Sequence, residues 1–328
     1  YCSVILMGLL ILRLLRLLIC LRFLLLQPAD GFVGFYDTAI GQFNAAFFTG
    51  EILTMYAMLG LILPLSCRLS DRSIAIFATL LIIQPIDWCK VIYALCNPDY
   101  VAGPGLASHY FGIAFDVQKN GTFLETIRMN LWEGQLANLT WALEHGRILQ
   151  TPALFLFGML VGRKGLFLYS EQNEQHWLKA LGISLICFFP LYGLNNMLPE
   201  FITRNAIRVP LQLIISSLSN LSFMVLLVSG LLITFYRIKD RRFLMRFTSY
   251  GKMSLTNYIG QSVIGSLLFY HWGFELGRFL GITYSFFFGI LFVLLQMAFC
   301  SWWLSHFKHG PFEGLWKRLT WIGNNKRK

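Results

Sequence analysis

The chain contains few charged residues. Asp, Glu, Lys and Arg together make up only 13% of the 328 residues, whereas hydrophobic residues make up 56%. Soluble domains carry about 25% charged residues, so this composition excludes an ordinary water-soluble domain and predicts a polytopic membrane protein. The formal net charge of +11 fits that class, because excess Lys and Arg in membrane proteins mark the loops that stay in the cytoplasm. We therefore expect membrane lipid, and no nucleic acid, as a partner.

Several common chemical motifs are also missing. The seven cysteines are scattered, mostly in apolar runs, and no CxxC pair occurs, so we interpret them as small hydrophobic residues and predict no metal site and no cofactor. The sequence contains no GxSxG, HExxH, Walker or Rossmann motif. We therefore do not expect nucleotide hydrolysis as the energy source, and we detect no internal repeat.

Long apolar runs recur along the chain. Seven of them predict membrane-spanning helices, and a Leu-rich run with three arginines at residues 4–26 is either an eighth span or a poorly determined segment. The predicted fold class is therefore all-α, a polytopic transmembrane helix bundle with seven or eight spans. The seven spans cover residues 51–67, 73–95, a run that begins near 137 or 143 and ends at 162, and residues 178–196, 209–236, 253–272 and 280–304.

The charges of the connecting loops alternate from span to span. Lys and Arg gather after the first, third, fifth and seventh spans, whereas acidic residues gather in the long stretch 97–144. The positive-inside rule then places the basic loops and the carboxyl terminus in the cytoplasm, and residues 97–144 outside it as a lid or re-entrant segment. We divide the chain into an uncertain segment 1–42, spans and an extracytoplasmic loop in 43–164, and a carboxyl-terminal membrane domain in 165–328.

A polar stripe marks the sixth predicted span. Asn257, Tyr258 and Gln261 recur at helical spacing with Ser254, Ser262 and Gly265, so they share one face of the helix. An amide that faces lipid finds no hydrogen-bond partner, so Asn257 and Gln261 must face protein or a water-filled cavity. The stripe is either interhelical packing or a wall that binds substrate.

Asp87 and Lys90 stand within the second predicted span. Their spacing lets them pair on one helix face, and Pro85 just before them leaves a backbone carbonyl without its helical partner. The pair is either self-neutralising or part of a proton or ligand site.

Acidic and basic residues precede the third span. Glu133, Glu144, His145 and Arg147 include an acid beside an imidazole, the minimum for general acid–base catalysis, so we retain them as candidate catalytic residues. Glu144 and His145 point about 100° apart on a helix, so they are not expected to share a target.

Four short segments resemble the YeiB-like family of bacterial inner-membrane proteins, which carries a domain of unknown function (418) and whose activity is not settled. The family pattern Gly-Arg-Met-Ser/Ala-Leu-Thr-Asn-Tyr…Gln-Ser is similar to residues 251–262, and its Gly-Pro-Leu-Glu-Trp-Leu-Trp-Arg element is similar to residues 310–318. Residues 50–53 and 158–163 look like two further family elements. The departures are Lys252 for Arg and Gly314 for Trp.

The resemblance implies a bacterial inner-membrane location and an enzyme hypothesis, because the family's helix pattern is similar to that of membrane acyltransferases. An acyl donor and an envelope glycan or lipid would then be partners, with Glu133, Glu144, Arg147, Asn257 and Gln261 at the site. The alternatives are a secondary transporter or exporter that uses Gln84, Asp87, Lys90, Asn257 and Gln261, and a non-catalytic membrane scaffold. Whether the chain is an enzyme stays open at this point.

Overall fold

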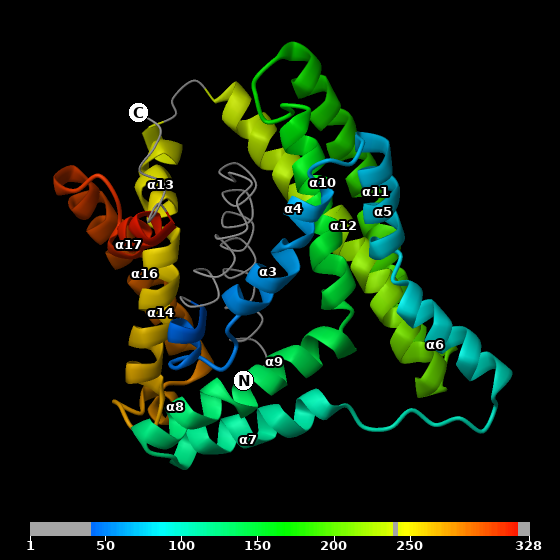
Figure 1. Ribbon diagram of the computed structural model, residues 1–328, viewed down its shortest axis with the longest axis horizontal. Coiled ribbons are helices and arrows are strands. Elements are labelled where there is room, and N and C mark those ends of the chain that lie inside the picture. Colours follow the sequence, from blue (N-terminus) through cyan, green and yellow to red (C-terminus); the bar gives the residue numbers. More distant parts are fainter. Residues whose placement is uncertain (1–40, 239–241, 321–328) are drawn as a thin grey trace. The chain divides into compact units, whose positions relative to one another are not determined.

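The structure is a computed structural model that describes residues 41–238 and 242–320, and over these residues it contains helices and no strands (Figure 1). The described chain divides into two compact units. Unit 1 takes in the described residues up to 61, residues 106–140 and the described residues from 242 onward, and unit 2 takes in residues 62–105 and those from 141 to 238. The uncertain segment 1–42 and its predicted span lie almost entirely outside the described residues.

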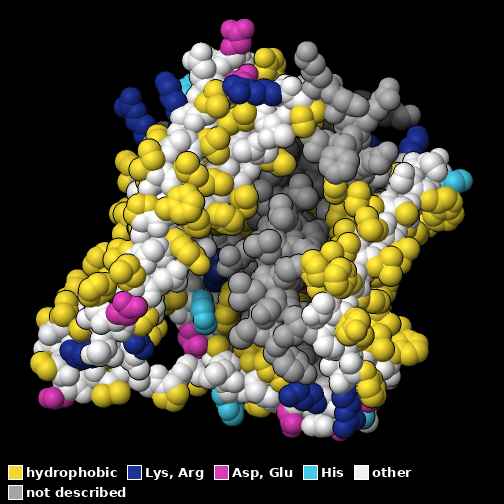
Figure 2. Space-filling view, turned by 180° about the vertical axis from the view of Figure 1, so that it is seen from behind, with side chains coloured by type: hydrophobic (Ala, Val, Ile, Leu, Met, Phe, Trp, Pro, Cys, Tyr) yellow, Lys and Arg dark blue, Asp and Glu magenta, His cyan; other side chains and the backbone are white. Residues whose placement is uncertain are grey.

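Unit 2 contains an antiparallel hairpin of two long helices, α11 (Glu171–Phe201) and α12 (Asn205–Arg237). The helix α11 begins where the hydroxyl of Ser170 accepts a hydrogen bond from the backbone N–H of Asn173 (3.1 Å), which satisfies a donor that the first turn leaves open. The helix α12 also packs against α6 (Pro85–Cys96). Apolar side chains cover the sides of the long helices (Figure 2), as is typical of helices that face lipid.

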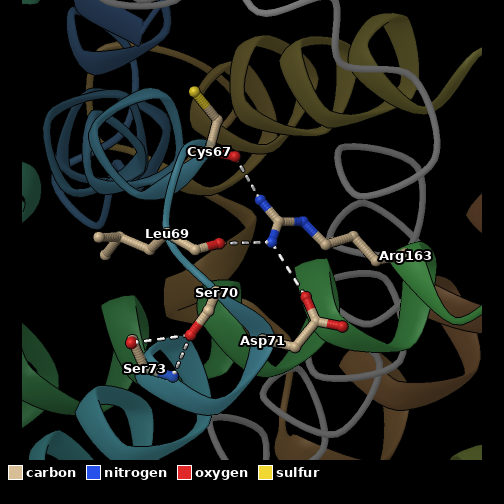
Figure 3. Close-up of polar contacts among 6 residues, drawn as sticks. All are labelled: Cys67, Leu69, Ser70, Asp71, Ser73 and Arg163. Carbon is tan, nitrogen blue, oxygen red and sulfur yellow. Dashed lines mark hydrogen bonds and ion pairs between the residues drawn. The ribbon is translucent and has the colours of Figure 1, made fainter.

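Three more helices of unit 2 pack together: α4 (Ile62–Ser66), α5 (Asp71–Ile82) and α10 (Arg147–Arg163). Ile74, Ala78 and Leu156 are fully buried between α5 and α10. Arg163, at the end of α10, donates hydrogen bonds to the backbone carbonyls of Cys67 (2.6 Å) and Leu69 (3.0 Å) and pairs with Asp71 (3.1 Å; Figure 3). The arginine of the family-like element 158–163 therefore holds the turn between α4 and α5.

Unit 1 contains α13 (Arg242–Lys252), α14 (Ser254–Phe269) and α16 (Ile282–His306), with α13 packed against both of the others. The short helices α15 (Leu276–Phe279) and α17 (Pro311–Thr320) pack against α14. The helix α3 (Leu53–Gly60) contributes Leu53 to a core that it shares with Ile52, Tyr258 and Ile259.

The acidic stretch 97–144, predicted as an extracytoplasmic loop, folds mainly into three helices: α7 (Leu106–Asn120), α8 (Phe123–Leu131) and α9 (Glu133–Glu144). The helix α8 begins with a capping box. The Thr122 hydroxyl accepts from the backbone N–H of Glu125 (3.4 Å), and the Glu125 carboxylate accepts from the backbone N–H of Thr122 (2.8 Å). The Glu125 carboxylate accepts from the backbone N–H of Thr122 and from the Thr122 hydroxyl (2.9 Å), and these two hydrogen bonds hold the pKa of the Glu125 carboxyl below its usual value.

The described helices indicate a membrane protein. Within residues 41–238 and 242–320, α11, α12 and most of α16 are long and apolar enough to cross a membrane. A fourth span results if α5 and α6, bent by 41°, count as one. The other predicted spans fall in shorter helices, because the run 51–67 is interrupted at Leu61 and α10 and α14 have only 17 and 16 residues. The total of seven or eight spans stays a prediction.

Candidate functional site

The amides of the polar stripe join three helices of unit 1. Asn257 of α14 donates from Nδ2 to the backbone carbonyl of Tyr250 on α13 (3.1 Å), and its Oδ1 accepts from the thiol of Cys300 on α16 (3.2 Å). Gln261 donates from Nε2 to the Tyr250 hydroxyl (3.1 Å) and to Oε1 of Gln296 on α16 (2.9 Å). The prediction that these amides face protein is confirmed, and these hydrogen bonds are those of interhelical packing.

Tyr258, on the same face of α14, reaches a different cluster. Its hydroxyl donates to Oε1 of Glu51 (3.4 Å) and accepts from the backbone N–H of Ile52 (3.4 Å). Glu51 is 1% exposed and also accepts from Asn44 Nδ2 (3.3 Å) and from the backbone N–H of Thr54 (3.1 Å). We call Asn44, Glu51, Thr54 and Tyr258 the Glu51 centre; all four residues are buried.

A second set of hydrogen bonds positions the backbone that carries Glu51. Asn138 of α9 donates from Nδ2 to the carbonyls of Thr49 (2.7 Å) and Glu51 (2.9 Å). The Thr49 hydroxyl donates to Oδ1 of Asn130 (2.5 Å) and accepts from Nε2 of Gln118 (2.7 Å). Side chains from α7, α8 and α9 therefore hold the segment 49–51, which fixes where the buried carboxylate lies.

The carboxyl-terminal motif completes the same region. Oε1 of Glu313 on α17 accepts hydrogen bonds from the backbone N–H groups of Leu255 (2.8 Å) and Thr256 (3.1 Å), at the start of α14. Its Oε2 accepts from the Thr256 hydroxyl (2.5 Å). These donors have no partner within the helix, and a carboxylate there also lies at the positive end of the helix dipole. Glu313 therefore caps α14 from outside that helix.

Gly310 lets α17 approach α14 this closely. A Cβ atom there would overlap Oε2 of Glu313 and lie 3.0 Å from both Met253 Cγ and Thr256 Oγ1. Phe312, two residues on, packs against the core of Ile52, Leu53, Tyr258 and Ile259. Three of the four segments that resemble the family, 50–53, 251–262 and 310–318, therefore meet in unit 1.

Unit 2 holds the second candidate site, where two helix interruptions meet. The break between α5 and α6 places Gln84 in a left-handed conformation (φ 63°), and the break between α9 and α10 does the same at Gly146 (φ 64°). Gln84 donates from Nε2 to the Gly146 carbonyl (2.9 Å) and to the hydroxyl of Ser217 on α12 (3.4 Å). That hydroxyl donates to the carbonyl of Ile82 at the end of α5 (3.3 Å). We call this arrangement the helix-break crossing.

Asp87 and Lys90 lie one turn beyond the crossing on α6. The predicted pair is confirmed, with Lys90 Nζ 2.7 Å from Asp87 Oδ1. The Asp87 side chain is 3% exposed and that of Lys90 47% exposed, so the pair joins a buried carboxylate to an accessible ammonium group.

The candidate catalytic residues divide between the two units. Glu133 begins α9 and is half-buried in unit 1. His145 is exposed in unit 2, stacks on Trp141 with the ring centroids 5.0 Å apart, and places Nδ1 3.0 Å from the Trp141 carbonyl. Arg147 lies over the same indole ring and donates to Oε1 of Gln150 (2.6 Å). Glu144 also lies in unit 2, beside Gly105.

Glu51 is a candidate site residue in the structure that the sequence did not predict. In the sequence it stands out only as part of the family-like element 50–53. The available signal was a single acid at the start of an apolar run, which does not identify a partner. Within the described ranges 41–238 and 242–320, no group of three or more His, Cys, Asp or Glu side chains could hold a metal ion.

Comparisons with known proteins identify one matching family and several similar proteins. Residues 161–323 match the family described as "Protein of unknown function (DUF418)". The uncharacterized protein YxaH of Bacillus subtilis is 23% identical over 285 residues, which cover 83% of this chain and 66% of YxaH. An uncharacterized 39.9 kDa protein of Bacillus acidopullulyticus is 37% identical over 83 residues, which cover 25% of this chain and 23% of that protein.

The uncharacterized protein YeiB of Escherichia coli is 38% identical over 74 residues, which cover 21% of this chain and 18% of YeiB. The chain spans less than two thirds of the length of these curated relatives. No solved structure matches it. Over residues 161–323, just under half of its length, the chain matches the DUF418 family, and it is similar to the uncharacterized proteins YxaH and YeiB.

Proposed function

We propose that this chain is a multi-pass protein of the bacterial inner membrane that transports a small polar solute, with its carboxyl terminus in the cytoplasm. The observation that carries the proposal is the helix-break crossing of unit 2. In this proposal the protein crosses the membrane seven or eight times, and the segment 53–66, α10 and α14 form short spans. The basic loops on one side of the predicted spans support the orientation.

A break inside a membrane span costs free energy, because backbone groups lose their helical partners where lipid offers none. The break at Gln84 lies inside the bent pair α5 and α6, which passes the composition test for one span. Such breaks are tolerated where they line a cavity or bind a solute, and transporters place their sites at interrupted helices. Two breaks in contact, at Gln84 and Gly146, therefore support a binding role better than a packing role.

The chemistry around the crossing suits a polar solute. Oε1 of Gln84 is buried and has no hydrogen-bond partner among the described residues, so it can accept from a solute N–H or O–H group. Asp87 and Lys90 supply both signs of charge close by. A solute that carries hydrogen-bond donors and one charge would match these groups.

A second candidate function is the acyltransferase-like modification of an envelope glycan or lipid. The specific observation in its favour is that His145 and Arg147 contact the same indole ring of Trp141, with Glu144 in the same turn. There an imidazole could take a proton from an acceptor hydroxyl while the guanidinium holds the oxyanion that forms on the acyl carbonyl. The partners would be an acyl donor and an envelope acceptor.

Gln84→Leu should abolish transport while the protein still reaches the membrane, because leucine keeps the volume and removes the amide that joins the two breaks. The measurement is a mass-spectrometric comparison of small polar solutes in medium and cytosol, for cells without the full-length protein and for cells that express the wild type or the variant. The wild type should shift the distribution of at least one solute by about tenfold or more relative to cells without the protein, whereas Gln84→Leu should leave it unshifted.

Gln212→Leu, the same change on α12 outside the crossing, is the control and should keep the shift. The masses of envelope glycans and lipids from the same cells are also measured by mass spectrometry. A mass change in the envelope that needs His145, with no solute shift, would reject transport and favour the acyltransferase-like function.

A further inference from the structure

The Glu51 centre contains a buried carboxylate without a cationic partner among the described residues. Glu51 accepts hydrogen bonds from the Asn44 amide, the Tyr258 hydroxyl and the backbone N–H groups of Leu53 and Thr54. Burial opposes the ionised carboxylate, whereas these donors favour it. In the part of the chain that the structure describes, no Lys, Arg or His side chain forms an ion pair with it.

Two side-chain oxygen atoms of residues that contact this carboxylate lack hydrogen-bond partners among the described residues. Oδ1 of Asn44 and Oγ1 of Thr54 are each buried and form no hydrogen bond within residues 41–238 and 242–320. Both residues already contact Glu51, one through its amide nitrogen and the other through its backbone N–H. A buried polar atom without a partner costs about 1–3 kcal/mol, so two of them beside one carboxylate point to a ligand.

We propose that the Glu51 centre binds a sodium ion through the carboxylate of Glu51, Oδ1 of Asn44 and Oγ1 of Thr54. The three groups offer only oxygen, which hard cations prefer and softer metals do not. One carboxylate with two neutral oxygens balances a single positive charge, and a divalent ion would leave a buried net charge. The ion would supply the charge partner that Glu51 lacks among the described side chains, and it would bind both oxygens that have no partner there.

The site lies in unit 1 and is independent of the solute site proposed in unit 2. Sodium-dependent stability is measured without transport, so the failure of one proposal is distinguishable from the failure of the other.

Thermal melting of the purified full-length protein in detergent tests the proposal. Sodium chloride is titrated against choline chloride at constant ionic strength, and potassium, magnesium and calcium chloride are compared. We expect the melting temperature of the wild type to rise by several degrees with sodium and to saturate, because a ligand that binds only the folded state stabilises it. Glu51→Gln should lose the response, and Thr54→Val should raise the half-saturating sodium concentration at least tenfold.

Two controls keep the test decisive. Glu313→Gln makes the same chemical change in the same unit, and it should lower the baseline melting temperature and keep the sodium response. If Glu51→Gln does not fold, the comparison of Thr54→Val with Thr54→Ser still tests the site. Serine keeps the hydroxyl, so Thr54→Ser should respond to sodium like the wild type. Equal shifts with sodium and choline, a response to magnesium or calcium instead of sodium, or a sodium response that survives both Glu51→Gln and Thr54→Val would overturn the proposal.

Discussion

Glu313→Ala should lower the free energy of unfolding by about 2–4 kcal/mol, because it removes a buried carboxylate that accepts three hydrogen bonds at the start of α14. The backbone N–H groups of Leu255 and Thr256 would lose their partner, and the hydrogen bond from the Phe312 N–H to the Thr256 hydroxyl (3.2 Å) would remain between α17 and α14. Chemical or thermal unfolding of the purified protein measures the effect. Glu313→Gln should lie between the wild type and the alanine variant, since its amide oxygen still accepts.

Glu171→Ala is the matched control for this prediction. Glu171 is an exposed acid in the first turn of α11, where truncation is expected to change stability by less than about 0.5 kcal/mol. If Glu313→Ala were as mild as this control, α17 would not cap α14.

Gly146→Ala should cost about 2–4 kcal/mol. Alanine is strained at a φ of 64°, which accounts for about 1–2 kcal/mol, and its Cβ would lie 2.8 Å from Oε1 and 3.0 Å from Nε2 of the Gln84 amide. The Gln84 side chain is 1% exposed and hydrogen-bonded to the Gly146 carbonyl, so it has little freedom to move aside. Unfolding measurements on the variant give the total cost.

Gly165→Ala separates the two contributions to that cost. Gly165 also has a positive φ (59°), but the nearest atom that its Cβ would meet is Leu168 Cδ1 at 3.6 Å. It should therefore show the strain alone, and the difference between the two variants reports the contact with Gln84. Gln84→Ala in the Gly146→Ala background should recover part of that difference, and no recovery would mean that the two breaks do not touch.

The periodicity of the sequence predicted the local features that proved correct. The spacing of Asp87 and Lys90 predicted their ion pair, and the polar face of α14 predicted that Asn257 and Gln261 would face protein. Pro85 marked the disruption of the second span. Each of these signals lies within one or two helical turns, where sequence spacing fixes which side chains can meet.

The Glu51 centre and the Glu313 cap could not be predicted in this way. Glu51 meets Tyr258 at a sequence separation of 207 residues, and Glu313 meets Thr256 at a separation of 57. Many polar side chains in the sequence could pair equally well with a single acid. Only the packing of α3, α14 and α17 selects the actual partner. The left-handed conformation of Gln84 could not be predicted from the sequence either, because glutamine has no preference for that conformation.

The meeting of the family-like segments 50–53 and 251–262 at Glu51 is tested most directly by a double-mutant cycle between Glu51→Gln and Tyr258→Phe. The free energies of unfolding of the wild type, both single variants and the double variant are compared. Direct contact predicts a coupling energy of about 0.5–3 kcal/mol. The same cycle with Tyr250→Phe, a tyrosine bonded to Gln296 instead, should be additive within about 0.5 kcal/mol. Additivity between Glu51 and Tyr258 would contradict the convergence of these segments on one buried carboxylate.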